Sequence, residues 1–298
     1  MKTSTLFHQF ARSSVLLFTL CAGFAPGRAA DLDLAKATAE ADKGDREAQY
    51  SVGRAYFKGE GVPQDLLKAM GYFHRAAEQG NFKAQNNLGS MYAQGQGVPK
   101  DVAEAIKWFR KAADQGDAVA LQNLGWLAAH EPGASTGNKE ALEWYQKAAE
   151  AGSADAQARV GDLYFRGENG VEKNYAEAAK WLGKAAAQGV TTAQNTLGVM
   201  YENGFGVERD EQQAVDFFRR AAELDNPKAQ SNLGRMYAGG SGVEKDPIKA
   251  YQWLTLAALR GEITAIKQRA VVGASLTDEE IASAKRLADE YRKAKLGK

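Results

Sequence analysis

The chain of 298 residues is 44% hydrophobic and 25% charged, which is typical of a soluble protein. Its 38 basic and 37 acidic residues nearly cancel. Charge therefore gives no drive toward nucleic acid or an anionic lipid surface, and we expect no nucleic-acid partner.

Residues 1–29 predict a cleavable signal peptide. Lys2 and Arg12 supply a positive start, residues 13–25 form a short apolar core, and a Gly-Arg-Ala sequence ending at Ala29 offers small residues for cleavage. The apolar run is too short for a stable membrane span, although an uncleaved anchor is the alternative. We expect cleavage near Ala29 and a periplasmic or secreted protein with no membrane span after processing.

The only cysteine, Cys21, lies inside this segment. Leu20 precedes it where a lipoprotein would carry a small residue, which argues against lipidation. After cleavage, 35 basic and 37 acidic residues and no cysteine would remain. Packing between helices, rather than disulfides, must then stabilise the exported chain.

The rest of the chain is built on a repeat of 36 residues, with one interval of 37. The repeat is marked by one recurring position, occupied by Gly44, Gly80, Gly116, Gly152, Gly189, Asp225 and Gly261. We bound six repeats at 45–80, 81–116, 117–152, 153–189, 190–225 and 226–261. Residues 30–44 are expected to form an N-terminal capping helix, and residues 262–298 C-terminal capping helices. So regular a period favours stacked units over a single globular core.

Each repeat opens with a helix of the pattern A-Q-x-x-L-G-x-x-Y, whose apolar positions lie on one stripe. The glycine inside this helix costs about 1 kcal/mol relative to alanine, so we expect a neighbouring helix to approach closely there. N-cap residues are predicted at Asp45, Asn81, Asp117, Ser153 and Asn226. Val190 breaks this series, and Thr191 is expected to cap instead.

A turn of the pattern G-x-G-V-x-x-D follows the first helix, as at 59–65, 95–101 and 204–210. Its glycines suit a left-handed helix end, and its aspartate suits the N-cap of the second helix. A phosphate-binding loop is the alternative. It is disfavoured because no Lys-Ser/Thr pair follows the glycines and no strand precedes them.

The second helix repeats A-x-x-[W/F/Y]-[F/Y/L]-x-x-A-A. Its aromatic position holds Trp108, Trp144, Trp181, Phe217 and Trp253 in successive repeats. A ligand-binding aromatic stripe is conceivable, but recurrence in every repeat favours a core position.

The third repeat departs most from the pattern. Its turn, residues 130–138, lacks G-x-G-V, and Ala128 stands in the tyrosine position. Drift, a hinge and a specialised contact site are the three interpretations, and the sequence favours drift. After Gly261 the pattern decays into a last first-type helix at 262–272, followed by a capping-box signature from Thr277 to Glu280.

These linked motifs together resemble the Sel-one-like repeat family, short relatives of tetratricopeptide repeats, over residues 45–261. The resemblance implies an all-α, right-handed solenoid superhelix of six helix-turn-helix repeats. It also implies a protein-binding scaffold, and exported bacterial members of the family act in the cell envelope.

Tetratricopeptide relatives line a concave groove with their first helices. We carry that mapping over by position: one, four and five residues after the mid-helix glycine, and three and six before it. The resulting candidate partner-binding residues are Tyr50, Arg54, Phe57, Lys58, Asn86, Gln94, Gln122, Trp126, His130, Asp162, Phe165, Arg166, Asn195, Glu202 and Arg235. Their charges are mixed, so no strongly charged ligand is indicated. Trp126 and Phe165 are the predicted anchors, although packing against a neighbouring helix is an alternative for both.

Three classes of function follow. The first is a non-enzymatic scaffold that binds an envelope protein or peptide in the groove. The second is a module that binds a peptidoglycan fragment or glycan through groove aromatics. The third, an enzyme, is disfavoured, because only His74 and His130 remain after processing, without a cysteine, and no catalytic or metal-binding constellation is readable. No cofactor is expected.

Overall fold

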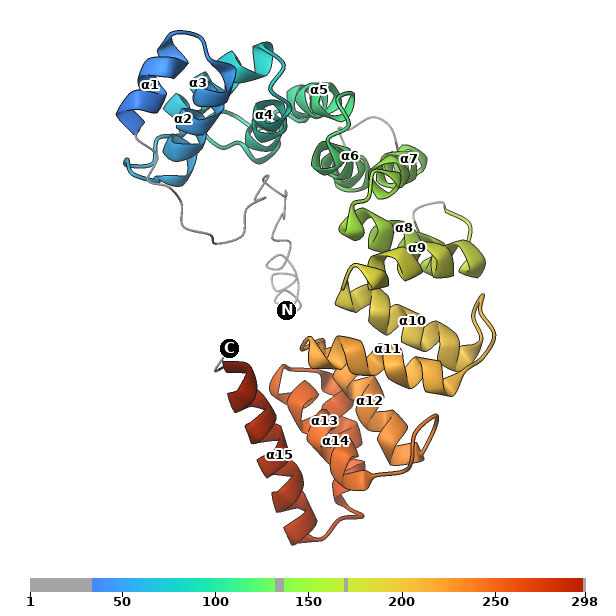
Figure 1. Cartoon of the computed structure of the whole chain (residues 1–298). Helices are drawn as coiled ribbons and strands as arrows, with labels where there is room; N and C mark the ends of the chain where they lie inside the picture. Colours follow the sequence, from blue (N-terminus) through green and yellow to red (C-terminus); the bar gives the residue numbers. More distant parts are fainter. Residues whose placement is uncertain (1–33, 132–136, 169–170, 297–298) are drawn as a thin grey trace, which may run out of the picture. The chain divides into compact units, whose positions relative to one another are not determined.

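The computed structural model describes residues 34–131, 137–168 and 171–296. The predicted signal peptide and most of the unusual turn of the third repeat lie outside these residues. Every regular element in the described ranges is an α-helix, as predicted (Figure 1).

The helices alternate between the two types that the repeat predicts. The first helices of the six repeats are α2 (Arg46–Lys58), α4 (Phe82–Gln94), α6 (Ala118–His130), α8 (Ala154–Arg166), α10 (Thr191–Asn203) and α12 (Pro227–Gly239). The second helices are α3 (Leu66–Glu78), α5 (Val102–Ala113), α7 (Gly137–Glu150), α9 (Tyr175–Ala187), α11 (Glu211–Glu223) and α13 (Pro247–Leu259). The array is flanked by α1 (Leu34–Asp42), α14 (Ile263–Gly273) and α15 (Asp278–Leu296).

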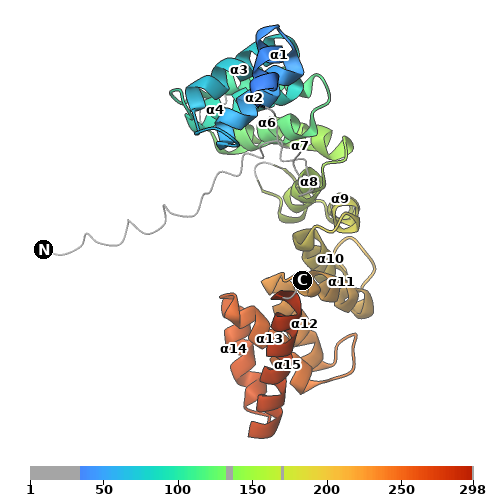
Figure 2. The same cartoon turned by 60° about the vertical axis from the view of Figure 1, so that its left-hand side comes forward.

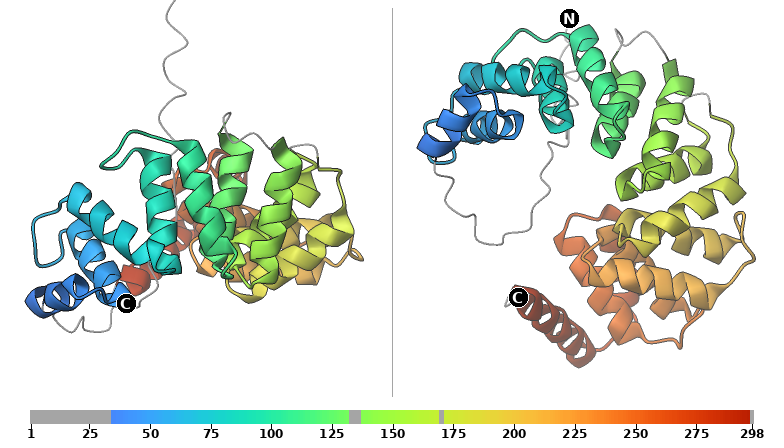
Figure 3. Two further views of the ribbon diagram at one scale, coloured as in Figure 1. Left: turned by 90° about the horizontal axis from the view of Figure 1, so that it is seen from above. Right: turned by 45° about the horizontal axis from the view of Figure 1, so that its top comes forward.

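The chain divides into two compact units, residues 1–144 (unit 1) and 145–298 (unit 2), with the boundary inside α7. In unit 1, α2 packs on α3 and α4 on α5, while α3 and α5 also contact the next first helix. Unit 2 repeats this arrangement from α8 to α14. Within each unit, therefore, helices that are neighbours in sequence are neighbours in space, as the colour order in Figure 3 shows.

The first helices begin where the sequence predicts. The side chains at five N-cap positions accept a hydrogen bond from a backbone amide two or three residues later, namely Asp45, Asn81, Asp117, Ser153 and Asn226. The expectation for Thr191 is wrong. Thr191 is the first helical residue of α10, and Val190 occupies the N-cap without a side-chain hydrogen bond.

The turns between the two helices also follow the prediction. Glycine ends five of the first helices in the left-handed region, with φ between 68° and 77°, at Gly59, Gly95, Gly167, Gly204 and Gly240. Side-chain oxygens then cap the second helices at Asp65, Asp101, Asn174, Asp210 and Asp246.

The mid-helix glycines are explained by close helix packing. A Cβ atom at Gly89 would lie 2.6 Å from the ring of Phe109, and one at Gly198 would lie 2.5 Å from the ring of Phe218. Both rings are fully buried and belong to the second helix of the same repeat. The ring thus occupies the space that a larger residue in the first helix would need.

The aromatic position of the second helix is only partly a core position. Trp108 and Trp181 are 5% exposed, as predicted. Trp144, Phe217 and Trp253 are only half-buried. In the fifth repeat, for example, the next residue of the motif, Phe218, is fully buried, while Phe217 lies at the edge of the core.

Glutamines connect the helices across the repeat boundaries. The side-chain amide of Gln85 donates to the carbonyl of Ala77 at 3.0 Å, near the end of the preceding second helix. Gln115, at the end of α5, donates to the Gln85 side chain at 2.8 Å. Because Gln85 is buried, these bonds satisfy polar groups that would otherwise be costly to remove from water.

The C-terminal helices close the array in unit 2. α13 lies between α14 and α15 in Figure 2, and it contacts both. The predicted capping box is formed: the amide of Thr277 donates to Glu280 at 2.8 Å, and the amide of Glu280 donates to the Thr277 hydroxyl at 3.3 Å. Among the described helices, none combines the length and the apolar character that a membrane crossing requires.

Candidate partner-binding surface

Three of the predicted binding residues lie in the core of unit 1, and for these the prediction is wrong. Tyr50 and Phe57 are each only 8% exposed and pack against Phe73, and Asn86 is fully buried. With 3.6 residues per turn, a position four residues after the mid-helix glycine lies only about 40° around the helix from it. That glycine faces the second helix, so Phe57 faces it too.

The other candidates in unit 1 lie nearer the surface. Arg54 and Lys58 are exposed, and each pairs with Glu60 at 3.5 Å. Gln94 and Gln122 are half-buried.

Trp126 and His130 form an aromatic pair at the end of α6. Their rings stack with centroids 4.6 Å apart and planes 13° apart, and Nδ1 of His130 lies 2.9 Å from the Trp126 carbonyl oxygen. Trp126 is half-buried and His130 is exposed. One face of the indole is therefore covered by a histidine of its own helix.

Unit 2 contains a cavity of about 380 Å³ on its first helices, which we call the first-helix cavity. The predicted residues Asp162, Arg166 and Asn195 line it together. The other lining residues are Asp155, Ala158, Arg159, Leu182, Val190, Thr192, Ala193, Thr196, Asn226 and Lys228. The structure thus brings candidates from α8 and α10 to one hollow, beside the start of α12.

Sequence reasoning missed several of these residues although the pattern contained them. Asp155, Thr192 and Lys228 each lie six residues before a mid-helix glycine, a position that the groove mapping already included. Arg159 and Thr196 lie two residues before the glycine, and the mapping had no such position.

Two arginines of the first-helix cavity pair with the carboxylate of Asp162. Nε of Arg166 donates to Asp162 at 2.9 Å, and Arg159 lies 3.9 Å from the same carboxylate. The hydrogen bond that Arg166 donates to Asp162, reinforced by the negative charge of that carboxylate, raises the pKa of Arg166 above its usual value. The cavity therefore offers fixed charges of both signs, together with the hydroxyl and amide groups of threonine and asparagine side chains.

Phe165 does not extend into the first-helix cavity. It is half-buried, with its ring 5.5 Å from Tyr175 and 6.3 Å from Phe205. Its ring neighbours are thus at the start of α9 and in the turn after α10, and it packs against a core cluster that includes Leu197 of the next first helix.

The last two candidates form a bridge between repeats. Arg235 binds Glu202 through two hydrogen bonds of 2.6 and 2.7 Å. Asn195 likewise accepts a hydrogen bond of 3.0 Å from Asn232. These side chains hold adjacent first helices together, and any partner would meet them as paired groups.

Neither of the two histidines in the described part of the chain belongs to a group of potential metal ligands. His74 is half-buried, with Nε2 3.3 Å from the Tyr92 hydroxyl and its ring edge-on to Trp108. Within the described residues, no group of three potential metal ligands comes together.

Comparison with known proteins identifies the repeat. The family description "Sel1 repeat" matches residues 46–81, 82–117, 118–153, 154–190, 191–226 and 227–262. A Sel1 repeat protein from Oxalobacter formigenes, known from its crystal structure, is 35% identical, with a TM-score of 0.61, and the match covers 76% of this chain and 94% of that one.

A second solved structure, a protective antigen of uropathogenic Escherichia coli strains with the same type of repeat fold, is 29% identical. Its TM-score is 0.45, and the match covers 87% of this chain and 71% of that one. No curated protein matches the chain.

The match to six repeats and the likeness to the Oxalobacter protein confirm the predicted all-α solenoid. This repeat fold is generally a non-catalytic scaffold for protein–protein interactions. With six tandem copies of its motif matched, the chain belongs to the Sel1 repeat family.

Proposed function

We propose that the protein is a non-enzymatic scaffold that holds a segment of a partner protein in the first-helix cavity of unit 2. The proposal is supported by the general role of the repeat fold. The observation that carries it is the convergence of Asp162, Arg166 and Asn195 on one cavity of about 380 Å³. A cavity of this size accommodates a short stretch of polypeptide, and its walls are already formed.

The chemistry of the cavity favours a polar segment that carries charges of both signs. Arg166 and Lys228 are exposed cations at the cavity, and Asp155 and Asp162 provide carboxylates. A partner with only one sign of charge would meet repulsion as well as attraction. A peptide backbone with mixed side chains can also hydrogen-bond to Asn195 and Thr196.

We place this scaffold in the bacterial cell envelope, as a periplasmic or secreted protein. The support is the leader-like pattern of residues 1–29, which lie outside the described part of the structure. Mass spectrometry of the protein purified from a bacterial host should find a mature N-terminus next to Ala29. A chain that keeps these residues and fractionates with the cytoplasm would contradict this location.

The binding proposal is tested by capture from an envelope extract. The double variant Arg166→Ala/Lys228→Ala removes two cations from the first-helix cavity and should reduce the captured partner by about tenfold. The matched control is Lys180→Ala/Arg219→Ala, which removes two cations from the second helices α9 and α11. Equal loss in both variants would contradict a role for the cavity.

Trp126 provides a second test in unit 1, since its ring is half-buried and stacks against the ring of His130. If the indole anchors a partner, Trp126→Ala should weaken capture by roughly 2 kcal/mol, the size typical of an interface hot spot, and leave the melting temperature nearly unchanged. Unchanged capture, or a large loss of stability, would assign Trp126 to packing alone.

The same half-exposed indole keeps one alternative open: a glycan or peptidoglycan fragment could stack on it. A glycan array distinguishes the two. Binding to sugars that is lost in Trp126→Ala would favour the glycan, whereas capture of a protein without array binding favours the scaffold.

A further inference from the structure

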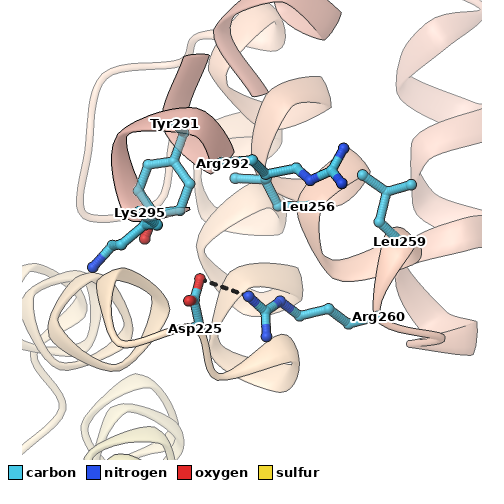
Figure 4. Close-up of a pocket in the computed structure, with 7 residues that line it drawn as sticks. All are labelled: Asp225, Leu256, Leu259, Arg260, Tyr291, Arg292 and Lys295. Atoms are coloured by element: carbon cyan, nitrogen blue, oxygen red, sulfur yellow. Dashed lines mark ion pairs between the residues drawn. The ribbon is translucent and has the colours of Figure 1, made fainter. Parts of the chain in front are cut away.

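Unit 2 contains a second cavity, of about 350 Å³, which shares no residue with the first-helix cavity. We call it the α15 pocket (Figure 4). It lies among the turn before α12, the C-terminal end of α13 and the C-terminal half of α15. Its lining residues are Asp225, Leu256, Leu259, Arg260, Tyr291, Arg292 and Lys295.

The α15 pocket has a fixed frame. The Tyr291 hydroxyl donates to the carbonyl of Glu223 at 3.0 Å, and Lys295 donates to the same carbonyl at 2.5 Å, so α15 is attached to the end of α11. The ring of Tyr291 also packs edge-on against Trp253 of α13. Burial, together with the carboxylates of Asp225 and Glu223, raises the pKa of Tyr291 to about 12, so its hydroxyl stays a donor at neutral pH.

The sixth repeat departs from the others at the residues of this pocket. Leu256 stands where the five preceding repeats have a basic residue, namely Arg75, Lys111, Lys147, Lys184 and Arg220. At the position of Leu259, the five preceding repeats have Glu78, Asp114, Glu150, Ala187 and Glu223. At the position of Arg260, they have Gln79, Gln115, Ala151, Gln188 and Leu224.

Packing explains only one of these changes. Leu256 is 3% exposed, as expected for a residue in the core. Leu259 is 58% exposed and Arg260 is also exposed, so the core of unit 2 requires neither an apolar residue nor an arginine there. An exposed leucine beside an arginine at a preformed cavity indicates a ligand with an apolar part and an anionic part.

Asp225 is a further departure. It adopts φ = 66°, in the left-handed region, whereas the corresponding positions of the other repeats hold glycine. Aspartate tolerates this conformation less well than glycine. Its carboxylate lies 3.0 Å from Arg260, and Figure 4 shows this pair on one side of the pocket, with Arg292 and Leu256 on the other.

The charge balance of the lining favours an anion. Asp225 pairs with Arg260, and Lys295 is engaged with the Glu223 carbonyl. Arg292 contacts Asp289 of its own helix at 3.5 Å, and both side chains are more than half exposed, so an incoming anion can compete for it. Three basic side chains thus line the pocket against one carboxylate.

We propose that the α15 pocket binds the C-terminal carboxylate of a peptide whose last residue is apolar. A guanidinium matches a carboxylate with two parallel hydrogen bonds, which suits Arg292 as the main contact. In a peptide C-terminus the carboxylate and the last side chain leave the same Cα, so one residue can reach both Arg292 and Leu259. A long polyanion would need a basic surface that continues beyond the pocket. The three basic side chains of the lining suit a single carboxylate instead.

Calorimetric titration with an acetylated tripeptide that ends in leucine tests the proposal. The free acid should bind, and the C-terminal amide of the same peptide should bind at least about tenfold more weakly. Replacing the last leucine with glycine should weaken binding to the wild type but have little effect in Leu259→Ser. Equal binding of acid and amide, or no binding of the acid at millimolar concentration, would overturn the proposal.

Variants on α15 supply a matched control. Arg292→Gln should weaken binding of the acid by about tenfold, whereas Lys293→Gln, which removes the same charge from the next, exposed residue outside the pocket, should leave it unchanged. Equal effects of the two would indicate a nonspecific charge effect and overturn the site. Vesicles of phosphatidylglycerol that bind in an Arg292-dependent way, while the peptide does not, would assign the pocket to lipid instead.

The variant Asp225→Asn is expected to strengthen peptide binding, whereas Arg292→Gln is expected to weaken it. Asparagine also tolerates the left-handed conformation, and it frees Arg260 from its ion pair. The acid peptide should then bind more tightly than to the wild type. A gain of affinity is not expected from a variant that merely disturbs the fold, and weaker binding with an unchanged melting temperature would contradict the assigned role of Asp225.

Discussion

At the scale of single residues, the mid-helix glycines set the distance between the two helices of a repeat. In Gly89→Ala the new methyl group would lie 2.6 Å from the buried Phe109 ring. Overpacking of this kind costs about 1–3 kcal/mol, more than the gain of about 1 kcal/mol that alanine brings to an open helix position. We expect a net loss of stability, measured as a lower urea midpoint.

Gly71 is the control for this prediction, because it lies inside α3 with nothing within 4 Å of its would-be Cβ. Gly71→Ala should raise stability by about 0.5–1 kcal/mol. Equal effects of the two substitutions would show that helix propensity, and not the approach of the second helix, decides the position.

The buried carboxylate of Asp117 is expected to lower the stability of the fold in a pH-dependent way. It is 9% exposed, its Oδ2 has no hydrogen-bond partner, and burial raises its pKa above 3.8. When burial raises the pKa of an acid in the folded state, the ionised acid lowers the free energy of unfolding at pH values above that folded pKa. The loss is absent at pH values below the pKa of the acid in the unfolded chain. Asp117→Asn, which keeps the N-cap chemistry of Asn81, should therefore stabilise the protein by roughly 1 kcal/mol at pH 7.

The stability gain of Asp117→Asn should vanish as the pH falls toward 3.8. Urea midpoints of the wild type and the variant, measured from pH 4 to pH 7, check this. A gain that stays constant across the range would show that the carboxylate ionises without cost.

At the scale of helices, the first helices are tied to one another by polar side chains as well as by packing. Asn123 donates to Asn86 at 3.0 Å between α6 and α4, and both are nearly fully buried. Asn123→Ala removes a partner from a buried oxygen, which should cost about 1–3 kcal/mol. In unit 2, Asn232→Ala breaks the same kind of bond at a half-buried site, where water can replace it.

We expect the unfolding free energy to fall more for Asn123→Ala than for Asn232→Ala, measured by urea denaturation. A larger loss for Asn232→Ala would mean that burial does not control the strength of these links.

Helix type, helix ends and turn chemistry could be predicted from the sequence because each depends on local residues. An aspartate or asparagine caps the next amides whatever lies beyond them, and a glycine ends a helix by its own φ. Thr191 is the exception. Helix α10 already includes Thr191 as its first residue, so the N-cap position falls on Val190.

The direction in which each candidate side chain points was harder to predict. The mapping from related repeats predicts that Phe57 and Tyr50 line a groove, yet Gly53 marks the face of α2 that meets the second helix, and both side chains lie near that face. Arg166 and Asp162 lie farther around the helix and do reach a cavity. The α15 pocket could not be predicted, because it depends on how α15 lies across α13 and α11.

At the scale of the whole molecule, the repeats provide a long series of first helices whose exposed positions can vary without loss of the fold. Stability is then spread over many similar neighbour contacts, so that individual surface positions are free to acquire binding roles. In unit 2, the mixed charges at Asp162, Arg166 and Lys228 occupy such positions.

The most direct test of the central claim, that a partner is bound at the first-helix cavity, is site-specific photo-cross-linking in envelope extract. A photoreactive amino acid at Thr192, which is exposed and lines the cavity, should form an adduct with one partner protein. The same amino acid at Gln212, exposed on the second helix α11, should not. Adducts from Gln212 but not from Thr192 would place the binding surface on the second helices and contradict the account.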